Sequence, residues 1–257
     1  MKCWVFSLVL MNFLPVLFAF GERGDAIDGP NSESGVAGSD YLRDFKEQLE
    51  LQWPKNKTIN VVFHGHSVPS GYFVAPRVRT LDAYPHLFLR YLKENYPNAV
   101  INCITTSIGG ENSQQGANRF KEDVLVMKPD VLFIDYGLND RGIGLEKAEA
   151  SWRRMIEYAL AAGVKAILFT PTPDLNEDIL DENAPLVDHA GMIRMLGEDY
   201  AIPVVDTYAR FKSLRESGCE LSKYMAQKNH PNALGHAEVL KEMVSTLFAE
   251  LPSDNPD

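Results

Sequence analysis

Residues 59–67 read Ile-Asn-Val-Val-Phe-His-Gly-His-Ser, an apolar, β-branched run that ends in a polar turn. A run of this kind is typical of a buried β-strand. Four further runs resemble it, and segments with an apolar period of three to four residues lie among them. The expected strands are 59–64, 99–106, 130–136, 165–170 and 203–206, and the expected helices are 82–95, 114–127, 145–162, 185–200 and 233–249. This alternation predicts an α/β protein in which a five-stranded parallel sheet lies between two helical layers.

The two ends of the chain differ in composition from its centre. The 257 residues, 45% of them hydrophobic, are enough for one domain, which we expect at residues 41–250. Within residues 1–21, Lys2 precedes an apolar run that is short for a membrane span, which predicts a cleaved signal peptide, with an uncleaved anchor as the alternative. Residues 22–40 are rich in Gly, Ser, Asp and Asn and predict a flexible linker. We expect residues 251–257 to form a disordered tail.

The charge balance restricts the partners of the protein. Twenty-five basic and 35 acidic side chains give a formal net charge of −10, and loss of Lys2 with the signal makes it more negative. Such a surface disfavours nucleic acid and anionic lipid, so we expect a small-molecule or glycan substrate and no stable membrane association after cleavage. Export predicts a secreted or periplasmic protein. Cys103 and Cys219 lie in unlike surroundings, an apolar run and a polar turn, so unpaired thiols are favoured over a disulfide.

Four residues that carry chemistry occupy loops near the expected strands. They are Ser67, Gly110, Asn139 and His230. The first three follow the first three strands, so a parallel sheet brings them to its carboxyl edge, where such sheets bind ligands. Each also has an ordinary explanation by itself, as a helix cap, a tight turn, a turn residue or an exposed loop histidine. Pro69 stands where a G-x-S-x-G nucleophile elbow needs its second glycine, which disfavours that family of hydrolases.

Taken together, the sequence around these residues resembles the SGNH hydrolase family, also called GDSL esterases and lipases. The matching blocks are Gly65-His66-Ser67, Ser107 through Gln115, Gly137-Leu138-Asn139-Asp140 and Asn229-His230-Pro231-Asn232. The resemblance spans residues 59–236. It implies a flavodoxin-like fold and hydrolysis of acyl esters without a cofactor.

The resemblance also implies a role for each of the four residues. Ser67 would be the nucleophile and His230 the general base that takes its proton. The backbone N–H groups of Ser67 and Gly110 would form the oxyanion hole with the side-chain amide of Asn139. We expect glycine at 110 because a backbone donor that approaches the substrate carbonyl needs the space of a Cβ atom.

Two positions depart from the family pattern. His66 replaces the aspartate of the Gly-Asp-Ser block, so the electrostatics beside Ser67 are open. Gln227 stands where the family has the aspartate that partners the histidine, and an amide cannot stabilise an imidazolium as a carboxylate does. Three alternatives follow: a Ser67–His230 dyad oriented by Gln227 or by a main-chain carbonyl, a carboxylate from elsewhere, or a weakened enzyme. The dyad is favoured because the oxyanion residues are intact.

Two acidic residues near these blocks have structural explanations. Asp206 ends the fifth expected strand, and we expect it to cap a helix that begins at Thr207. Asp140 adjoins Asn139, and we expect it to be held there. Neither is favoured as the missing carboxylate.

Two other kinds of protein remain as alternatives. His64, His66, His230 and His236 are of the residue type that binds zinc, although no carboxylate pair accompanies them at ligand-like spacing. A serine mechanism without a metal is favoured for that reason. The other alternative is a secreted carbohydrate-binding protein that keeps the fold and lost the chemistry together with the aspartate.

The substrate is suggested by the segment that follows the nucleophile. Tyr72, Arg77 and Arg79 supply an aromatic ring and two guanidinium groups suited to a sugar or a carboxylate, and a packed surface loop is an equally good explanation. The sequence contains no segment recognisable as an apolar lid. We therefore expect an O-acetyl ester of a carbohydrate as the substrate, with a short-chain lipid ester or a lysophospholipid as the alternative.

Overall fold

The computed structural model describes residues 38–248. The predicted signal peptide, the predicted tail and most of the predicted linker lie outside this part of the chain. The last residues of the predicted linker overlap a short helix, α1 (Gly38–Tyr41).

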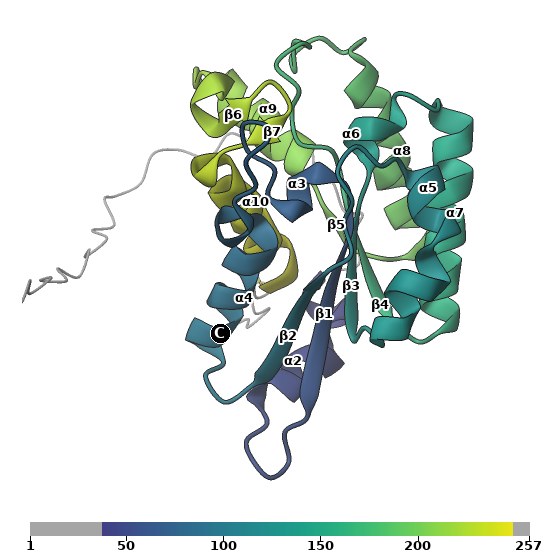
Figure 1. The fold of residues 1–257 in the computed structure, drawn as a ribbon, viewed down its shortest axis with the longest axis vertical. Helices are drawn as coiled ribbons and strands as arrows, with labels where there is room; N and C mark the ends of the chain where they lie inside the picture. Colours follow the sequence, from purple (N-terminus) through teal and green to yellow (C-terminus); the bar gives the residue numbers. More distant parts are fainter. Residues whose placement is uncertain (1–37, 249–257) are drawn as a thin grey trace, which may run out of the picture. The chain divides into compact units, whose positions relative to one another are not determined.

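A five-stranded parallel sheet forms the centre of the described region, with the strand order β2-β1-β3-β4-β5 (Figure 1). Each strand lies within two residues of its predicted bounds. The strands are β1 (Thr58–Gly65), β2 (Val100–Thr105), β3 (Val131–Asp135), β4 (Lys165–Phe169) and β5 (Val204–Val205). This order is that of flavodoxin-like folds, so the predicted fold is confirmed. A separate antiparallel pair joins β6 (Met225–Gln227) to β7 (His230–Pro231).

Helices cover both faces of the sheet (Figure 1). The helices of one face are α2 (Arg43–Glu50), α4 (Tyr84–Asn95), α9 (Thr207–Glu216) and α10 (Ala233–Phe248). Those of the other face are α5 (Ser113–Asn118), α7 (Leu145–Ala161) and α8 (Pro185–Tyr200). Two single-turn helices, α3 (Ser67–Ser70) and α6 (Gly137–Asp140), follow strand ends. Short 3₁₀ turns lie at Thr80–Asp82, Leu125–Met127 and Leu221–Tyr224.

The alternation of side chains along the strands produces two cores. Phe63 and Phe133 belong to the cluster under α4 and α10, where their rings stack with centroids 4.6 Å apart. Val62 and Leu132, their chain neighbours, belong to the cluster under α5 and α7. The central strands β3 and β4 are buried on both faces and are almost entirely apolar rather than alternating, as the sequence indicated.

Local sequence explains where the helices begin. Asn112 and Gln115 form a reciprocal capping box at the start of α5. Asp206 accepts a hydrogen bond from the N–H of Ala209, which confirms its predicted role as the cap of α9. The predicted helix at 114–127 is wrong in its continuity, because α5 stops at Asn118 and gives way to a π-turn at Phe120–Val124.

Two further observations bear on the sequence-based expectations. Cys103 and Cys219 are both free thiols, as the unlike surroundings indicated. Among the helices of residues 38–248, none has both the length and the apolar character required to cross a bilayer.

Candidate active site

The four residues singled out by the sequence meet at one edge of the sheet. Ser67 begins α3 directly after β1, Gly110 lies in the loop after β2, and Asn139 lies in α6 after β3. His230 reaches the same edge from β7, which contacts α3. Figure 1 shows α3, α6 and the β6–β7 pair at the end of the sheet where the strands finish.

Ser67 and His230 are in direct contact. The hydroxyl oxygen of Ser67 lies 2.9 Å from Nε2 of His230. Both side chains are buried, with 6% and 8% of their surface exposed. Burial lowers the pKa of His230 below its usual value, with the hydrogen bond to Phe73 opposing this effect and the nearby His66 adding to it. The imidazole is therefore neutral near pH 7, as a general base requires.

A main-chain carbonyl orients His230. Its Nδ1 lies 3.0 Å from the carbonyl oxygen of Phe73, and because a carbonyl only accepts, Nδ1 carries the proton and Nε2 is free to accept from Ser67. Within the described residues, no hydrogen bond joins Gln227 to the imidazole. The Oε1 atom of Gln227 accepts from the N–H of Ala75 at 3.3 Å instead. Of the two orienting groups considered for the dyad, the structure therefore places the carbonyl, and not Gln227, at Nδ1.

Gln227 has an indirect connection to this carbonyl. Ala75 belongs to the same tight loop as Phe73, which is closed by a hydrogen bond from the N–H of Phe73 to the carbonyl of Arg77 at 2.9 Å. By holding Ala75, Gln227 ties β6 to the loop that carries the carbonyl. The amide therefore stabilises the loop that positions the base.

Three hydrogen-bond donors come from the segments that follow β1, β2 and β3. Within the described residues, neither the N–H of Ser67 nor that of Gly110 donates to a protein acceptor. The side-chain amide of Asn139 donates one proton to the carbonyl of Glu111 at 2.8 Å, which leaves its second proton free. This hydrogen bond also fixes the amide against the loop that contains Gly110.

Backbone conformation gives a further reason for glycine at 110. A Cβ atom at Gly110 would meet no protein atom within 4 Å, so packing among the described residues does not require glycine. Its φ of +79° lies in the left-handed region that other residues rarely adopt, and this conformation is what favours glycine. Close packing instead requires Gly109, where a Cβ atom would lie 2.6 Å from the ring of Tyr72.

A buried polar network supports the loop after β2. Glu111 accepts from Arg119 and, at 2.7 Å, from the hydroxyl of Tyr136. The Tyr136 hydroxyl also lies 3.2 Å from Nε2 of His64, whose Nδ1 contacts the hydroxyl of Thr106. Burial, with Arg119 nearby, lowers the pKa of His64 to about 3, so this imidazole is a neutral packing group.

Asp140 joins the loop of Asn139 to two helices. Its carboxylate accepts from the N–H of Ser113 and from the indole N–H of Trp152, both at 2.7 Å. The side chain is fully buried, and burial raises its pKa although these hydrogen bonds oppose the shift. Asp140 is thus held beside Asn139 as expected, and it serves α5 and α7 rather than His230.

A second histidine also contacts the serine hydroxyl. Nδ1 of His66 is 3.4 Å from the hydroxyl oxygen of Ser67 and accepts from the N–H of Val68 at 3.3 Å. Its Nε2 faces a carboxylate oxygen of Asp135 at 3.4 Å. The other oxygen of Asp135 accepts from the Tyr84 hydroxyl at 2.9 Å, and burial together with Asp135 raises the pKa of Tyr84 well above its usual value.

A family comparison bears directly on this arrangement. The chain matches the GDSL-like Lipase/Acylhydrolase family over residues 63–238, which include the four residues described above. The protein belongs to the GDSL-like lipase/acylhydrolase family. This membership confirms the resemblance drawn from the sequence, and the protein is accordingly a carboxylic ester hydrolase.

Solved structures of esterases share the fold of this GDSL-family protein. An acetyl-xylooligosaccharide esterase of Geobacillus stearothermophilus, Axe2, has a TM-score of 0.66 and 19% identity, with 78% of this chain and 97% of the other covered. A two-domain esterase, CEX, active on acetylated mannans and crystallised with mannopentaose, has a TM-score of 0.67 and 20% identity, with 84% and 57% covered. At these identities the likeness establishes the fold alone.

One curated protein is similar over a shorter range. The uncharacterized lipoprotein YqeF of Bacillus subtilis (strain 168) is 36% identical over 81 residues, which cover 28% of this chain. The match spans about a third of the length of that relative.

The segment predicted to contact substrate forms one wall of the GDSL-family site. The ring of Tyr72 lies between Gly109 and His230, with its centroid 5.9 Å from that of the imidazole. Arg79 stacks on the ring of Phe73 at 4.0 Å and pairs weakly with Asp82. The same loop exposes three apolar side chains, Val74, Val78 and Leu81, the last with 70% of its surface accessible. These three exposed side chains give the loop beside Ser67 an apolar surface.

The remaining predicted binding residue, Arg77, is exposed. Its backbone closes the tight loop of Phe73, and its guanidinium makes no hydrogen bond or ion pair within the described residues. A guanidinium in this position is available to a ligand.

The histidines considered as zinc ligands are engaged in separate contacts. His64 and His66 have the partners given above, and Nδ1 of His236 accepts from the N–H of Tyr84 at 3.3 Å. Burial and the nearby His230 lower the pKa of His236 to about 3. Over residues 38–248, no three His, Cys, Asp or Glu side chains are grouped as a metal-binding set.

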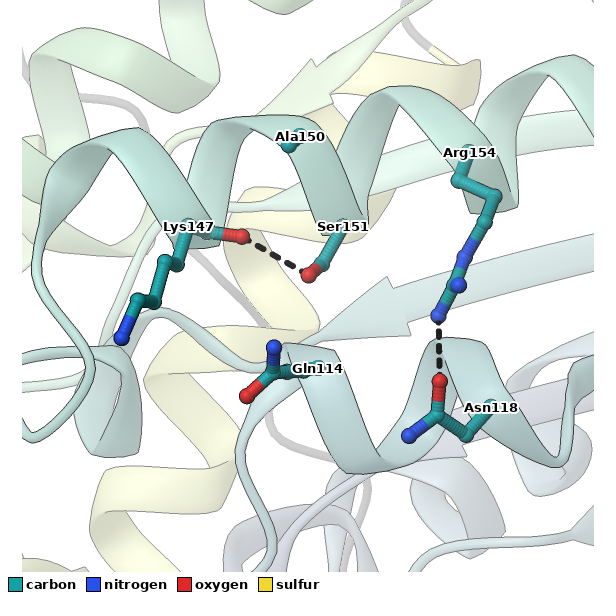
Figure 2. A pocket seen from close by; sticks show the side chains of 6 residues that line it. All are labelled: Gln114, Asn118, Lys147, Ala150, Ser151 and Arg154. Atoms are coloured by element: carbon teal, nitrogen blue, oxygen red, sulfur yellow. Dashed lines mark hydrogen bonds between the residues drawn. The ribbon is translucent and has the colours of Figure 1, made fainter.

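A hollow with a volume of about 330 Å³ lies between α5 and α7, apart from the residues around Ser67 (Figure 2). Its polar lining is tied up locally, since the Ser151 hydroxyl donates to the carbonyl of Lys147 and Arg154 donates to Asn118. The hollow contains a serine but no histidine to activate it, so it lacks the parts that acyl transfer needs.

Several residues of the site carry no sequence signal that identified them. The carbonyl of Phe73 belongs to the backbone, which every residue has. Asp135 and Tyr84 are far apart in the chain, and a carboxylate that ends an otherwise apolar strand was the one available hint.

Proposed function

We propose that this protein is an exported serine esterase that removes O-acetyl groups from a carbohydrate. The observation that carries the proposal is the 2.9 Å contact between the Ser67 hydroxyl and Nε2 of His230, beside two uncommitted backbone N–H groups. A nucleophile bonded to a neutral base, with donors grouped next to it, is the arrangement that acyl transfer requires.

The proposed reaction has two stages. The hydroxyl of Ser67 attacks the acetyl carbonyl while its proton passes to Nε2 of His230, and the negative oxygen is bound by the N–H groups of Ser67 and Gly110 and by Asn139. His230 then protonates the departing sugar oxygen, which leaves acetyl-Ser67. Water gives a proton to His230 and attacks the acetyl group, and acetate departs as Ser67 recovers its proton.

The orientation of the base is part of this proposal. When His230 becomes an imidazolium, its Nδ1–H keeps the hydrogen bond to the Phe73 carbonyl. A neutral carbonyl fixes the ring but stabilises the positive charge less than a carboxylate would. The mechanism is therefore that of a dyad.

Two observations support a carbohydrate as the substrate. One is the set of side chains near His230, and the other is the substrates of the two solved esterases. Tyr72 presents a ring beside His230, and Arg77 presents an unpaired guanidinium on the same loop. The two esterases of similar fold act on acetylated xylo-oligosaccharides and acetylated mannans. The sugar is proposed from the residues beside His230 together with the shared fold, because an identity of 19% or 20% does not establish a shared substrate.

A specific observation favours a second candidate, a short-chain lipid ester. The exposed Val74, Val78 and Leu81 give the loop beside Ser67 an apolar surface that an acyl chain would cover. The two candidates differ in which part of the substrate this loop contacts.

Export is proposed from the amino-terminal sequence. The apolar run within residues 1–21 is that of a signal peptide, and the Bacillus subtilis relative is described as a lipoprotein. Fractionation of cells that produce the full chain, followed by mass determination of the mature amino terminus, tests this part separately.

The substrate is tested by kcat/KM measured on a matched panel. Acetylated xylo-oligosaccharides and manno-oligosaccharides are compared with 4-nitrophenyl acetate, 4-nitrophenyl decanoate and a lysophospholipid. We expect the acetylated sugars to be the best substrates and the decanoate and lysophospholipid the worst. A preference for the long acyl chain would favour the lipid alternative. Sugar binding without turnover would overturn the enzymatic proposal and favour a carbohydrate-binding protein.

A further inference from the structure

A buried carboxylate is connected to Ser67 through the second histidine, His66. Asp135 is buried, with 3% of its surface exposed, and faces His66, which in turn contacts the serine hydroxyl. Among the described residues no carboxylate forms a hydrogen bond or ion pair with His230. The site therefore contains a carboxylate–imidazole pair in contact with the nucleophile, but not the pair that the family pattern uses.

Hydrogen bonding determines where the proton of His66 resides. Its Nδ1 accepts from the N–H of Val68, so this nitrogen carries no proton and Nε2 carries it. Nε2 lies 3.4 Å from one oxygen of Asp135, close enough for a charge contact but without the geometry of a hydrogen bond, and the second oxygen is held by Tyr84. The lone pair of Nδ1 faces both Val68 and the hydroxyl of Ser67.

The same contact prepares the oxyanion hole. The first N–H groups of a helix have no partner within it, and in α3 these belong to Ser67 and Val68. His66 takes the N–H of Val68 as a cap and leaves that of Ser67 free. One imidazole thus fixes the turn that holds the nucleophile.

Strand pairing brings the carboxylate to this position. Gly65 pairs with Asp135 in the register of β1 and β3, and a Cβ atom at Gly65 would lie 2.4 Å from the carbonyl oxygen of Asp135. Glycine therefore permits the close approach of the two strand ends that places His66 beside the carboxylate.

We propose that Asp135, acting through His66, is the negative charge that stabilises the imidazolium of His230 during ester hydrolysis. This inference rests on the proposed function. His66 is a positioning residue in contact with the nucleophile, and Asp135 is a positioning residue one step further away. The negative charge of Asp135 thereby replaces the charge of the family aspartate, whose position is occupied here by the neutral Gln227.

The charged and titratable groups around His66 come from four elements. Asp135 of β3 faces its Nε2, and Tyr84 of α4 holds that carboxylate. His230 of β7 contacts the same serine hydroxyl. Asp140 of α6 is close enough that a positive charge on His66 would lower the pKa of the Asp140 carboxyl. Of the two carboxylates, only Asp135 pairs with the imidazole.

The test is the pH profile of kcat/KM for Asp135→Asn with an acetyl ester as substrate. The amide can turn its oxygen toward Nε2 of His66 and its NH₂ toward the Tyr84 hydroxyl, which can accept, so the shape of the side chain is kept and the charge is lost. Loss of this negative charge disfavours the imidazolium of His230. We expect kcat to fall about tenfold, KM to stay within about twofold, and the acidic limb to shift to lower pH by about half a unit to one unit. If Asp135→Asn leaves both kcat and the acidic limb of the pH–rate profile unchanged, the inference is overturned.

A charge-relocation variant tests the pair as a unit. His66→Asp places two carboxylates face to face and should reduce kcat further than Asp135→Asn does. Adding Asp135→Asn to His66→Asp removes one of these charges, and we expect kcat to recover at least about fivefold relative to His66→Asp alone. A double variant no faster than His66→Asp would contradict the proposed coupling.

Two controls separate this inference from the proposed function and from general loss of structure. His189 is a buried histidine of α8 outside the site, and His189→Asn should leave the pH limb unchanged. Ser67→Ala, assayed in the same series, must abolish turnover for the proposed function to stand. If Ser67→Ala is inactive while Asp135→Asn matches the unmodified enzyme at every pH, the function survives and the inference fails.

Discussion

The two sides of Ser67 are built differently. On one side, His230 lies 2.9 Å from the hydroxyl, comes from the short strand β7, and is oriented by a neutral carbonyl in a loop. On the other side, His66 lies 3.4 Å away at the end of a central strand and is backed by a buried carboxylate and a tyrosine. We call the contact with His230 the loop side of the site and the contact with His66 the sheet side; the buried carboxylate belongs to the sheet side.

This difference indicates that two roles can be filled by different groups: fixing the orientation of the His230 ring, and compensating the positive charge of its imidazolium. An aspartate partner of a catalytic histidine performs both at once. Here the Phe73 carbonyl orients the ring, and we assign the charge to Asp135 across the nucleophile. Substitutions on the two sides should therefore have different signatures in rate and in pH dependence.

The largest effect should come from the residue that the two sides share. Ser67→Ala removes the proposed nucleophile, and we expect kcat to fall at least about ten-thousand-fold, while the free energy of unfolding changes by about 1 kcal/mol or less. Mass spectrometry after treatment with a serine-directed phosphonate should locate one label, on Ser67. Ser151→Ala, which alters the serine of the hollow in Figure 2, should label normally. Retained turnover in Ser67→Ala would reject the serine mechanism.

The next largest effect should arise on the loop side. His230→Ala removes the proposed base, and kcat should fall by about a hundredfold to ten-thousand-fold with little change in KM. In the unmodified enzyme, burial lowers the pKa of His230, so the neutral form persists at lower pH and the rate should decline only below about pH 6.5. If the rate instead begins to decline well above pH 6.5, a nearby carboxylate must raise the pKa of His230 by more than burial lowers it.

A somewhat smaller effect is expected at the oxyanion donors, which belong to neither side. Asn139→Ala should reduce kcat about a hundredfold to a thousandfold, because the amide acts on charge that develops in the transition state. The acidic limb should not move, since the substitution removes a dipole and not a charge near His230. Steady-state kinetics across pH measures both quantities. A loss confined to KM would recast Asn139 as a residue that binds the ground state of the substrate.

The smallest effect should come from Gln227. Because the Phe73 carbonyl already occupies Nδ1 of His230, Gln227→Ala should lower kcat/KM by less than about threefold, through the lost contact with Ala75, and leave the acidic limb in place. Gln227→Glu keeps an acceptor for Ala75 at the same length and serves as the matched control.

Gln227→Asp gives the sharpest contrast, because it restores the family residue. A rise in kcat together with an upward shift of the limb by a full unit would show that a carboxylate at 227 reaches Nδ1. That outcome would contradict the division of tasks between the two sides. We expect a shift of no more than a few tenths of a unit, from the added charge alone.

The sequence predicted the strands and the loop residues that form this site better than it predicted the hydrogen-bond and charge partners of the two histidines. Apolar runs and helical periodicity depend on local composition, so β1 through β5 were located to within two residues, and their order in a parallel sheet brought Ser67, Gly110 and Asn139 to one edge. The predicted helix at 114–127 failed where Arg119 turns back to Glu111, a contact between residues eight apart that periodicity does not encode.

The partners of the two histidines were beyond the reach of residue patterns for different reasons. The Phe73 carbonyl has no side-chain identity, so the sequence could suggest a main-chain acceptor but not name it. The pairing of His66 with Asp135 depends on the register of β1 against β3, which forms between segments some 70 residues apart.

The Phe73 hydrogen bond has a consequence for how this enzyme can change its substrate. A main-chain carbonyl is supplied by any of the twenty residues, so the catalytic orientation of His230 constrains the path of the loop and not its side chains. Positions such as Val74, Arg77 and Val78 can therefore be randomised to select new substrates with the base left in place. A library at these positions that keeps the turn should vary widely in KM among substrates while its members share one pH limb.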